Sequence, residues 1–244
     1  MGLAPIAPTP QAIAVLHRLD LRAIERSLRA LKRALPTVSH ALANIQPPLE
    51  ETSVAAMLAG YAEIDRLARR HVDLFARGQS ARILALNRLV LYGEPKPAGH
   101  HHHRALEIGE RHFYESRGGG IGDLVDWRDR HRTLPPSRLA AGLYARLQNA
   151  PQLFVEGNHR TGALLVSHVL LRHGLPPFVV TPESAAEWFA LTPELQRFPR
   201  HGPAMLFHGR GLQRRIAALI RRQADPRHLV AAPTRREISA DGPW

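Results

Sequence analysis

Apolar residues recur along this chain mostly at helical spacing. The first clear stripe is formed by Ile13, Val15, Leu16, Leu19, Ile24, Leu28 and Leu31. Residues three and four positions apart lie on one face of an α-helix, so the stripe predicts a helix with one buried side. Pro36 follows the stripe, and because proline lacks a backbone N–H group we expect the helix to end there.

The same spacing, interrupted by prolines and glycines, predicts further helices along the chain. We expect one to begin at Thr52 or Ser53, where a hydroxyl can cap it. Others are expected at about 80–92, 106–114, 121–130, 136–149, 158–173 and 204–222, and a further helix is expected to begin near 182. Gly174 is expected to terminate the helix that ends near His173. The short apolar run at 178–180 is the best candidate for a strand.

Composition supports a mainly helical protein. Ala, Leu and Arg dominate and favour helices, whereas aromatic residues make up only 6% of the 244 residues. The fold class is therefore expected to be all-α. We predict an N-terminal helical extension over 1–50, a helical domain over 51–223 and a disordered tail over 224–244, where the chain becomes polar and proline-containing.

Several classes of protein are disfavoured by the sequence. No apolar run approaches the roughly 20 residues that span a bilayer, so we expect no membrane association. The N-terminus lacks a charged segment followed by an apolar one, and the chain has no cysteine. Disulfides and thiolate metal sites are thereby excluded, and we expect a cytoplasmic protein.

The net charge of +12 comes mostly from arginine. Such a balance can attract nucleic acid, nucleotides or an acidic protein surface. The arginines are scattered, however, and the basic stretch Arg210–Arg222 carries an apolar stripe typical of a helix packed on the body of the protein. Nucleic acid is therefore the least favoured partner. The tract His100–His103 can capture metal ions, but it lacks the spacing of a built site.

The segment from Pro151 to Ala163 carries the candidate chemistry. Phe154 is an apolar anchor, and Gly157-Asn158 opens a strongly apolar helix. A helix N-terminus offers unpaired N–H groups and partial positive charge to an anion. Arg160 can add a forked guanidinium for phosphate, and Glu156 can hold Mg²⁺ together with a diphosphate. Gly-Asn before a helix is equally typical of ordinary capping, with Asn158 as the N-cap.

The nine residues Phe154-Val155-Glu156-Gly157-Asn158-His159-Arg160-Thr161-Gly162 resemble the signature of the Fic/Doc family, His-Pro-Phe-x-Asp/Glu-Gly-Asn-Gly-Arg-x-x-Arg. The resemblance extends over about 52–189. It implies a helical Fic-like fold with a small β-hairpin flap, for which 95–100 or 118–121 are the candidates. It also implies phosphate or nucleotide binding by Gly157, Asn158, Arg160, Thr161 and Gly162, with Mg²⁺ at Glu156. Family members mostly transfer AMP or another phosphate-containing moiety to a protein hydroxyl.

Three positions depart from the signature. Gln152 stands where the family has its general-base histidine, and an amide cannot accept that proton. His159 replaces a glycine, and Ala163 replaces the second arginine. His159 is the nearest alternative base in sequence, although a partly exposed histidine at a helix start needs no such role. In some relatives an inhibitory helix pairs a glutamate with the second arginine, and here Met57 occupies the matching position.

Two hypotheses follow for function. The first is a divergent Fic-type protein that binds a nucleotide or another phosphorylated ligand at Glu156–Thr161, with any transfer to a partner protein following a non-standard mechanism. The second is a catalytically inactive module whose surface binds a protein. An arginine-driven nucleic-acid binder is a weaker third alternative.

Overall fold

The computed structural model describes residues 17–40, 49–94, 100–116, 119–197 and 203–230. Over these residues the fold is built from α-helices: α1 Leu21–His40, α2 Glu51–Arg69, α3 Ser80–Tyr92, α4 His100–Glu115, α5 Ile121–Arg130, α6 Pro136–Gln148, α7 Asn158–Leu171, α8 Pro182–Gln196 and α9 Pro203–Arg222, followed by the short 3₁₀ helix η1 Pro226–His228. The predicted all-α fold class is confirmed.

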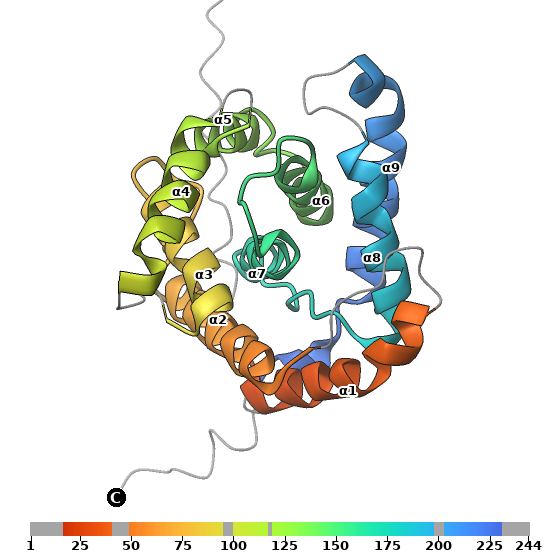
Figure 1. The fold of residues 1–244 in the computed structure, drawn as a ribbon. Coiled ribbons are helices and arrows are strands. Elements are labelled where there is room, and N and C mark those ends of the chain that lie inside the picture. The colour runs from red at the N-terminus through yellow and green to blue at the C-terminus, as the bar shows by residue number, and fades with distance from the viewer. Residues whose placement is uncertain (1–16, 41–48, 95–99, 117–118, 198–202, 231–244) are drawn as a thin grey trace, which may run out of the picture.

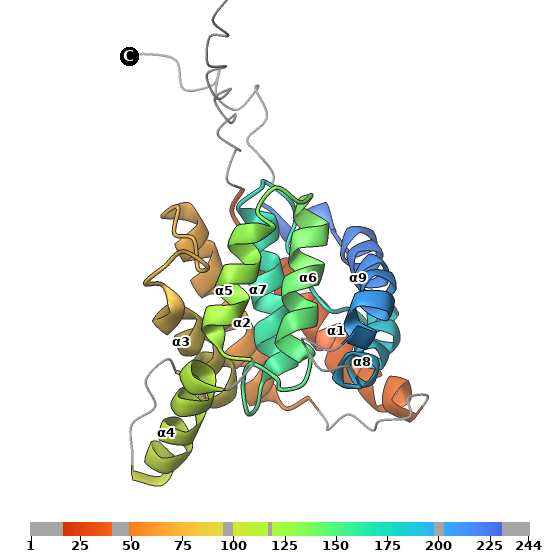
Figure 2. The ribbon, with the colours of Figure 1, turned by 90° about the horizontal axis from the view of Figure 1, so that it is seen from above.

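Helix α7 is the centre of the fold. Every residue from Thr161 to Leu171 is buried, and α7 packs against α2, α3 and α6. Figure 1 shows this arrangement, with α4 on one side of α7 and α8 and α9 on the other. Figure 2 confirms the same order from a second direction. A helix that is apolar on all faces must be surrounded, and this burial fixes where its N-terminus lies.

The predicted end of the first helix is wrong. Helix α1 does not end at Pro36 but continues to His40 with the proline inside it. Proline removes one N–H group, and the buried Leu31 and Leu35 keep the preceding turn in place against the core. The basic stretch Arg210–Arg222 lies within α9. Its apolar residues Ile216 and Ile220 are both buried, as expected for a helix packed on the body of the protein.

The apolar run at 178–180 does not form a strand. Phe178 makes only an isolated antiparallel bridge to Ala224. Its backbone is satisfied by side chains instead, because its N–H donates to the Ser167 hydroxyl at 3.0 Å and its carbonyl accepts from Tyr61 at 2.8 Å. Buried backbone groups need hydrogen bonds, but a sheet is only one way to supply them.

No strand is present among the described residues, and so no hairpin flap is seen there. Of the two flap candidates, residues 119–120 form a turn and Ile121 already begins α5. Residues 95–99 and 117–118 lie outside the described part of the chain. The histidine tract opens α4, and among its side chains only that of His103 is described, 3.2 Å from Glu107.

The two ends of the described chain lie side by side. The Val230 N–H donates to the Arg18 carbonyl at 2.8 Å, and the Asp20 N–H donates to the His228 carbonyl at 2.9 Å. Residues 224–230 of the predicted tail therefore pack beside the start of α1. Residues 231–244 lie outside the described residues. None of the described helices combines the length and the apolar character needed to cross a membrane.

Gly174 terminates the helix as the sequence predicts, in the left-handed region at φ 70°. The Leu175 N–H donates to the Leu170 carbonyl at 3.0 Å, and the Gly174 N–H donates to Leu171 at 2.9 Å. These two bonds are the pattern of a Schellman cap, which needs a residue with positive φ.

The substitution Gly174→Ala is therefore expected to lower the free energy of unfolding by about 1–2 kcal/mol, because a Cβ atom disfavours the left-handed region. Gly109→Ala in α4 is the matched control: its Cβ meets nothing within 4 Å, so about 0.5–1 kcal/mol of stabilisation is expected. Urea unfolding of both variants measures the difference. Equal effects of the two substitutions would contradict the role of the cap.

Candidate functional site

A single side chain holds the loop that precedes α7. The Asn158 amide accepts from the Phe154 N–H at 3.0 Å and donates to the Phe154 carbonyl at 2.7 Å. Both backbone polar groups of Phe154 are thereby paired with the side chain of one residue, Asn158, which is only 6% exposed. Asn158 does not act as the N-cap, contrary to the sequence prediction, because its side chain is committed to the loop.

Gly157 is the N-cap of α7 and lies in the left-handed region at φ 75°. No side chain caps this helix start. A Cβ atom at Gly157 would come within 2.8 Å of the Asn87 amide nitrogen. The first turn of α7 therefore begins at a glycine, at the end of the helix that carries partial positive charge.

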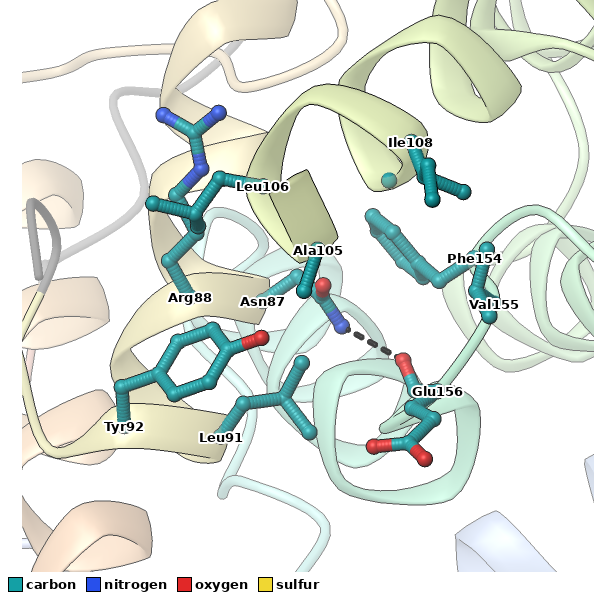
Figure 3. A pocket seen from close by; sticks show the side chains of 11 residues that line it. Asn87, Arg88, Leu91, Tyr92, Ala105, Leu106, Ile108, Phe154, Val155 and Glu156 are labelled. Atoms are coloured by element: carbon teal, nitrogen blue, oxygen red, sulfur yellow. Dashed lines mark hydrogen bonds between the residues drawn. The ribbon is translucent and has the colours of Figure 1, made fainter. Parts of the chain in front are cut away.

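Asn87 on α3 connects the loop to the helix, and the sequence reasoning missed it. Its Nδ2 atom donates to the Glu156 carbonyl at 2.9 Å and to the Thr161 hydroxyl at 3.0 Å. Figure 3 shows Asn87 pointing toward Glu156. A polar residue amid the apolar pattern of 83–90 is a signal that sequence alone could have offered.

Arg160 turns toward α3. Its Nη1 atom donates to the Val90 carbonyl at 2.6 Å. Carbonyls in the last turn of a helix are free to accept such bonds and carry partial negative charge. Burial lowers the pKa of Arg160, and the nearby charge of Glu156 opposes that shift. The guanidinium therefore lies at the edge of the site, held by α3.

Glu156 lies at the rim of a pocket of about 270 Å³ between α3, α4 and the loop. Its side chain is exposed. The pocket is mostly apolar and is lined by Asn87, Arg88, Leu91, Tyr92, Ala105, Leu106, Ile108, Gly109, Phe154, Val155 and Glu156 (Figure 3). Magnesium usually binds one or two carboxylates together with phosphate oxygens, and a single exposed carboxylate beside a helix start fits that pattern. Among the described residues no cluster of three metal ligands exists.

Gln152, which the sequence resemblance places where the family has its base, pairs with a second amide side chain. Gln152 donates from Nε2 to Gln148 Oε1 at 2.9 Å. Its own backbone carbonyl lies 2.8 Å from Nε2 of His112 on α4. The next residue of α4, Phe113, stacks on Phe154 with ring centroids 5.4 Å apart. The sequence reasoning did not single out His112.

His159 contacts α6 and α8. Its Nδ1 atom is 3.0 Å from the hydroxyl of Tyr144 on α6, and its ring meets Phe189 of α8 edge-on at 5.5 Å. Burial lowers the pKa of His159 to about 4. His159 is the nearest alternative base in sequence, and this lowered pKa makes it a weak base at neutral pH.

The last residues of the motif are buried. Thr161 is fully buried, and Ala163 is 2% exposed in the core. A Cβ atom at Gly162 would lie 2.8 Å from the Tyr144 ring, so glycine is needed for α6 and α7 to pack. Met57, at the place of the inhibitory glutamate, is also buried in α2.

The structure thus brings the predicted residues together around one loop. Asn158 bonds directly to Phe154, and Asn87 joins the Glu156 carbonyl to the Thr161 hydroxyl. His159 contacts Tyr144 of α6 and Phe189 of α8. Gln152 bonds through its side chain to Gln148 of α6 and through its backbone carbonyl to His112 of α4.

Sequence comparison finds Fic proteins. The chain is 34% identical over 73 residues to the protein adenylyltransferase Fic-1 of Caenorhabditis briggsae, and 36% identical over 73 residues to that of Caenorhabditis elegans. The matched stretch is 29% of this chain and 14% of each relative. No family model matches the chain. The resemblance to Fic proteins is confirmed by these relatives.

Two solved structures are also similar. A Fic domain containing signaling protein from Bacteroides thetaiotaomicron is 18% identical, with a TM-score of 0.42 over 84% of this chain and 92% of that chain. A structure of Fic-1 from Caenorhabditis elegans is 22% identical, with a TM-score of 0.42 over 86% of this chain and 61% of that chain.

Proposed function

We propose that this chain is a divergent Fic-type protein that binds the phosphates of a nucleotide, or of another phosphorylated ligand, at the N-terminus of α7. The observation that carries the proposal is the clamp formed by Asn158. Asn158 fixes the loop by bonding to Phe154, and the N-cap residue Gly157 has no side chain. The loop is thus held in place directly before the helix end that carries partial positive charge.

The surrounding charges support an anion at this place. Arg160 and the helix start both favour negative charge, and Glu156 can hold a Mg²⁺ ion shared with a diphosphate. With such a ligand bound, Mg²⁺ would neutralise phosphate charge and help to orient the group that is transferred. The chain itself supplies the amides, the guanidinium and the carboxylate.

The reaction that this arrangement suits is transfer of a phosphate-containing moiety, such as AMP, to a hydroxyl of a partner protein. Fic-1 relatives are named as protein adenylyltransferases. Here the base of the family signature is replaced by Gln152, which is hydrogen-bonded to Gln148. Any transfer by this chain must therefore take the proton from the acceptor hydroxyl in another way.

Calorimetric titration with Mg²⁺ and ATP, GTP or CDP tests the binding step. Arg160→Ala is expected to weaken binding of the preferred nucleotide about 10–100-fold, because a charge-assisted hydrogen bond contributes roughly 1.5–3 kcal/mol. Arg215→Ala is the matched control, since Arg215 lies on α9 and pairs with Glu194. Absence of binding by the unaltered chain, or equal binding by the Arg160 variant, contradicts the proposal.

A second candidate function is a protein-binding module without catalysis. The contact of Arg160 with Val90 and the amide pair at Gln152 favour it, because both give motif residues a structural role. Incubation of cell extract with labelled nucleotide separates the two functions. Label on a protein that is lost with Arg160→Ala excludes a purely structural module.

A further inference from the structure

The last turn of α4 is fixed against the loop at the position where the base is missing. His112 Nε2 lies 2.8 Å from the Gln152 carbonyl oxygen. Its neighbour Phe113 is fully buried and stacks on Phe154 with an angle of 10° between the rings. His112 and Phe113, which are consecutive on α4, thus both contact the loop at 152–154. The hydrogen bond joins residues that are 40 positions apart in sequence.

The contact also determines which nitrogen of His112 carries the proton in the neutral ring. A carbonyl oxygen can only accept a hydrogen bond, so Nε2 must be the donor. In neutral imidazole the other nitrogen, Nδ1, then carries the lone pair. An orienting acceptor on one nitrogen and a basic second nitrogen is the arrangement that general-base histidines use.

The other candidate does not meet these requirements. The Nδ1 atom of His159 is engaged with the Tyr144 hydroxyl, and the ring packs against Phe189. With its pKa lowered to about 4 by burial, His159 is a weak base. Figure 1 shows that its partners on α6 and α8 lie across α7 from α4.

We propose that His112, contributed by α4, is the general base that replaces the missing histidine at position 152. The inference rests on the proposed function. The acceptor hydroxyl of a protein gives its proton to Nδ1 of His112 while its oxygen forms a bond to the α-phosphorus of a nucleoside triphosphate. The bond from that phosphorus to the bridging oxygen breaks, and pyrophosphate leaves with the electron pair.

The variant His112→Gln provides the sharpest test. A glutamine Nε2–H can still donate to the Gln152 carbonyl, but an amide cannot act as the base. We expect nucleotide affinity and the midpoint of thermal unfolding to be unchanged. Transfer is measured as label that passes from the α-phosphate of ATP, GTP or CTP to protein in extract. We expect its rate constant to fall about 10²–10⁴-fold.

A second substitution distinguishes base chemistry from loop positioning. Gln152→His places an imidazole at the family position, and in the His112→Gln background it is expected to restore transfer. A histidine that only positioned the loop would not be replaced by this change. His159→Gln is the companion variant and is expected to retain transfer.

The outcomes separate the two proposals. If no nucleotide binds the full chain, the proposed function is overturned, and the role of His112 with it. If nucleotide binds but the chain transfers no label, or His112→Gln transfers it as fast as the unaltered chain, only the role of His112 is overturned.

Discussion

Replacement of Asn158 by alanine is expected to lower the free energy of unfolding by about 2–5 kcal/mol and to abolish nucleotide binding. The side chain pairs with both the N–H and the carbonyl of Phe154, at 3.0 and 2.7 Å. Alanine at position 158 leaves the N–H and the carbonyl of Phe154 without these hydrogen bonds, and Phe154 is buried, with only 3% of its surface exposed. Each buried backbone group without a hydrogen bond costs about 1–3 kcal/mol.

Urea unfolding measures the loss in stability, and calorimetry with nucleotide and Mg²⁺ measures the loss in binding. Gln79→Ala is a suitable control, because that side chain bonds only to the nearby Arg82 on the surface. Surface changes of this kind usually stay within about 0.5 kcal/mol. A loss below 1 kcal/mol for Asn158→Ala would show that the clamp does not hold the loop.

Acidification from pH 7 to pH 5 is expected to destabilise the protein by about 3 kcal/mol. Burial lowers the pKa of His168 to about 4, assisted by the positive charge of Arg172. Burial likewise lowers the pKa of His159 to about 4. In the unfolded chain both rings have a pKa near 6.5. Between these values the unfolded chain binds more protons, so stability rises with pH.

The stability that these histidines contribute is thus complete above about pH 6.5 and is lost as the pH falls toward 4. For the fully buried His168 the linkage relation gives about 2 kcal/mol at pH 5, and half-buried His159 adds a smaller amount. Denaturant unfolding at pH 7, 6 and 5 measures the change.

The variant His168→Gln isolates the larger contribution. His168 Nε2 accepts from the Leu74 N–H at 3.3 Å, and a glutamine oxygen can take over that bond. We expect the variant to lose about 2 kcal/mol less than the unaltered chain between pH 7 and pH 5. Equal stability of the unaltered chain at both values would contradict the lowered pKa.

The helices could be predicted from sequence where periodic apolar residues are bounded by breakers. The bounds of α3 and α5 agree with the prediction, and Gly174 ends α7 as expected. The failures share a cause, because tertiary contacts outweigh local preference. Pro36 is tolerated within α1, and the backbone of Phe178 bonds to side chains rather than to a second strand.

The candidate site could be predicted only as a segment. The motif localised the loop because its residues are contiguous. Its partners Asn87, His112 and Tyr144 come from three different helices, and nothing local in the sequence indicates which of their atoms meet the loop. The lowered pKa of His159 also depends on neighbours from α6 and α8.

The Val90 carbonyl and a bound phosphate would compete for hydrogen bonds from the Arg160 guanidinium. A phosphate that recruits this guanidinium takes it from the end of α3, so occupancy of the site and cohesion of that helix end are thermodynamically linked. The linkage is reciprocal. Fraying of α3 near Tyr92 would raise the affinity for anions, and a protein surface that clasps this helix end would lower it.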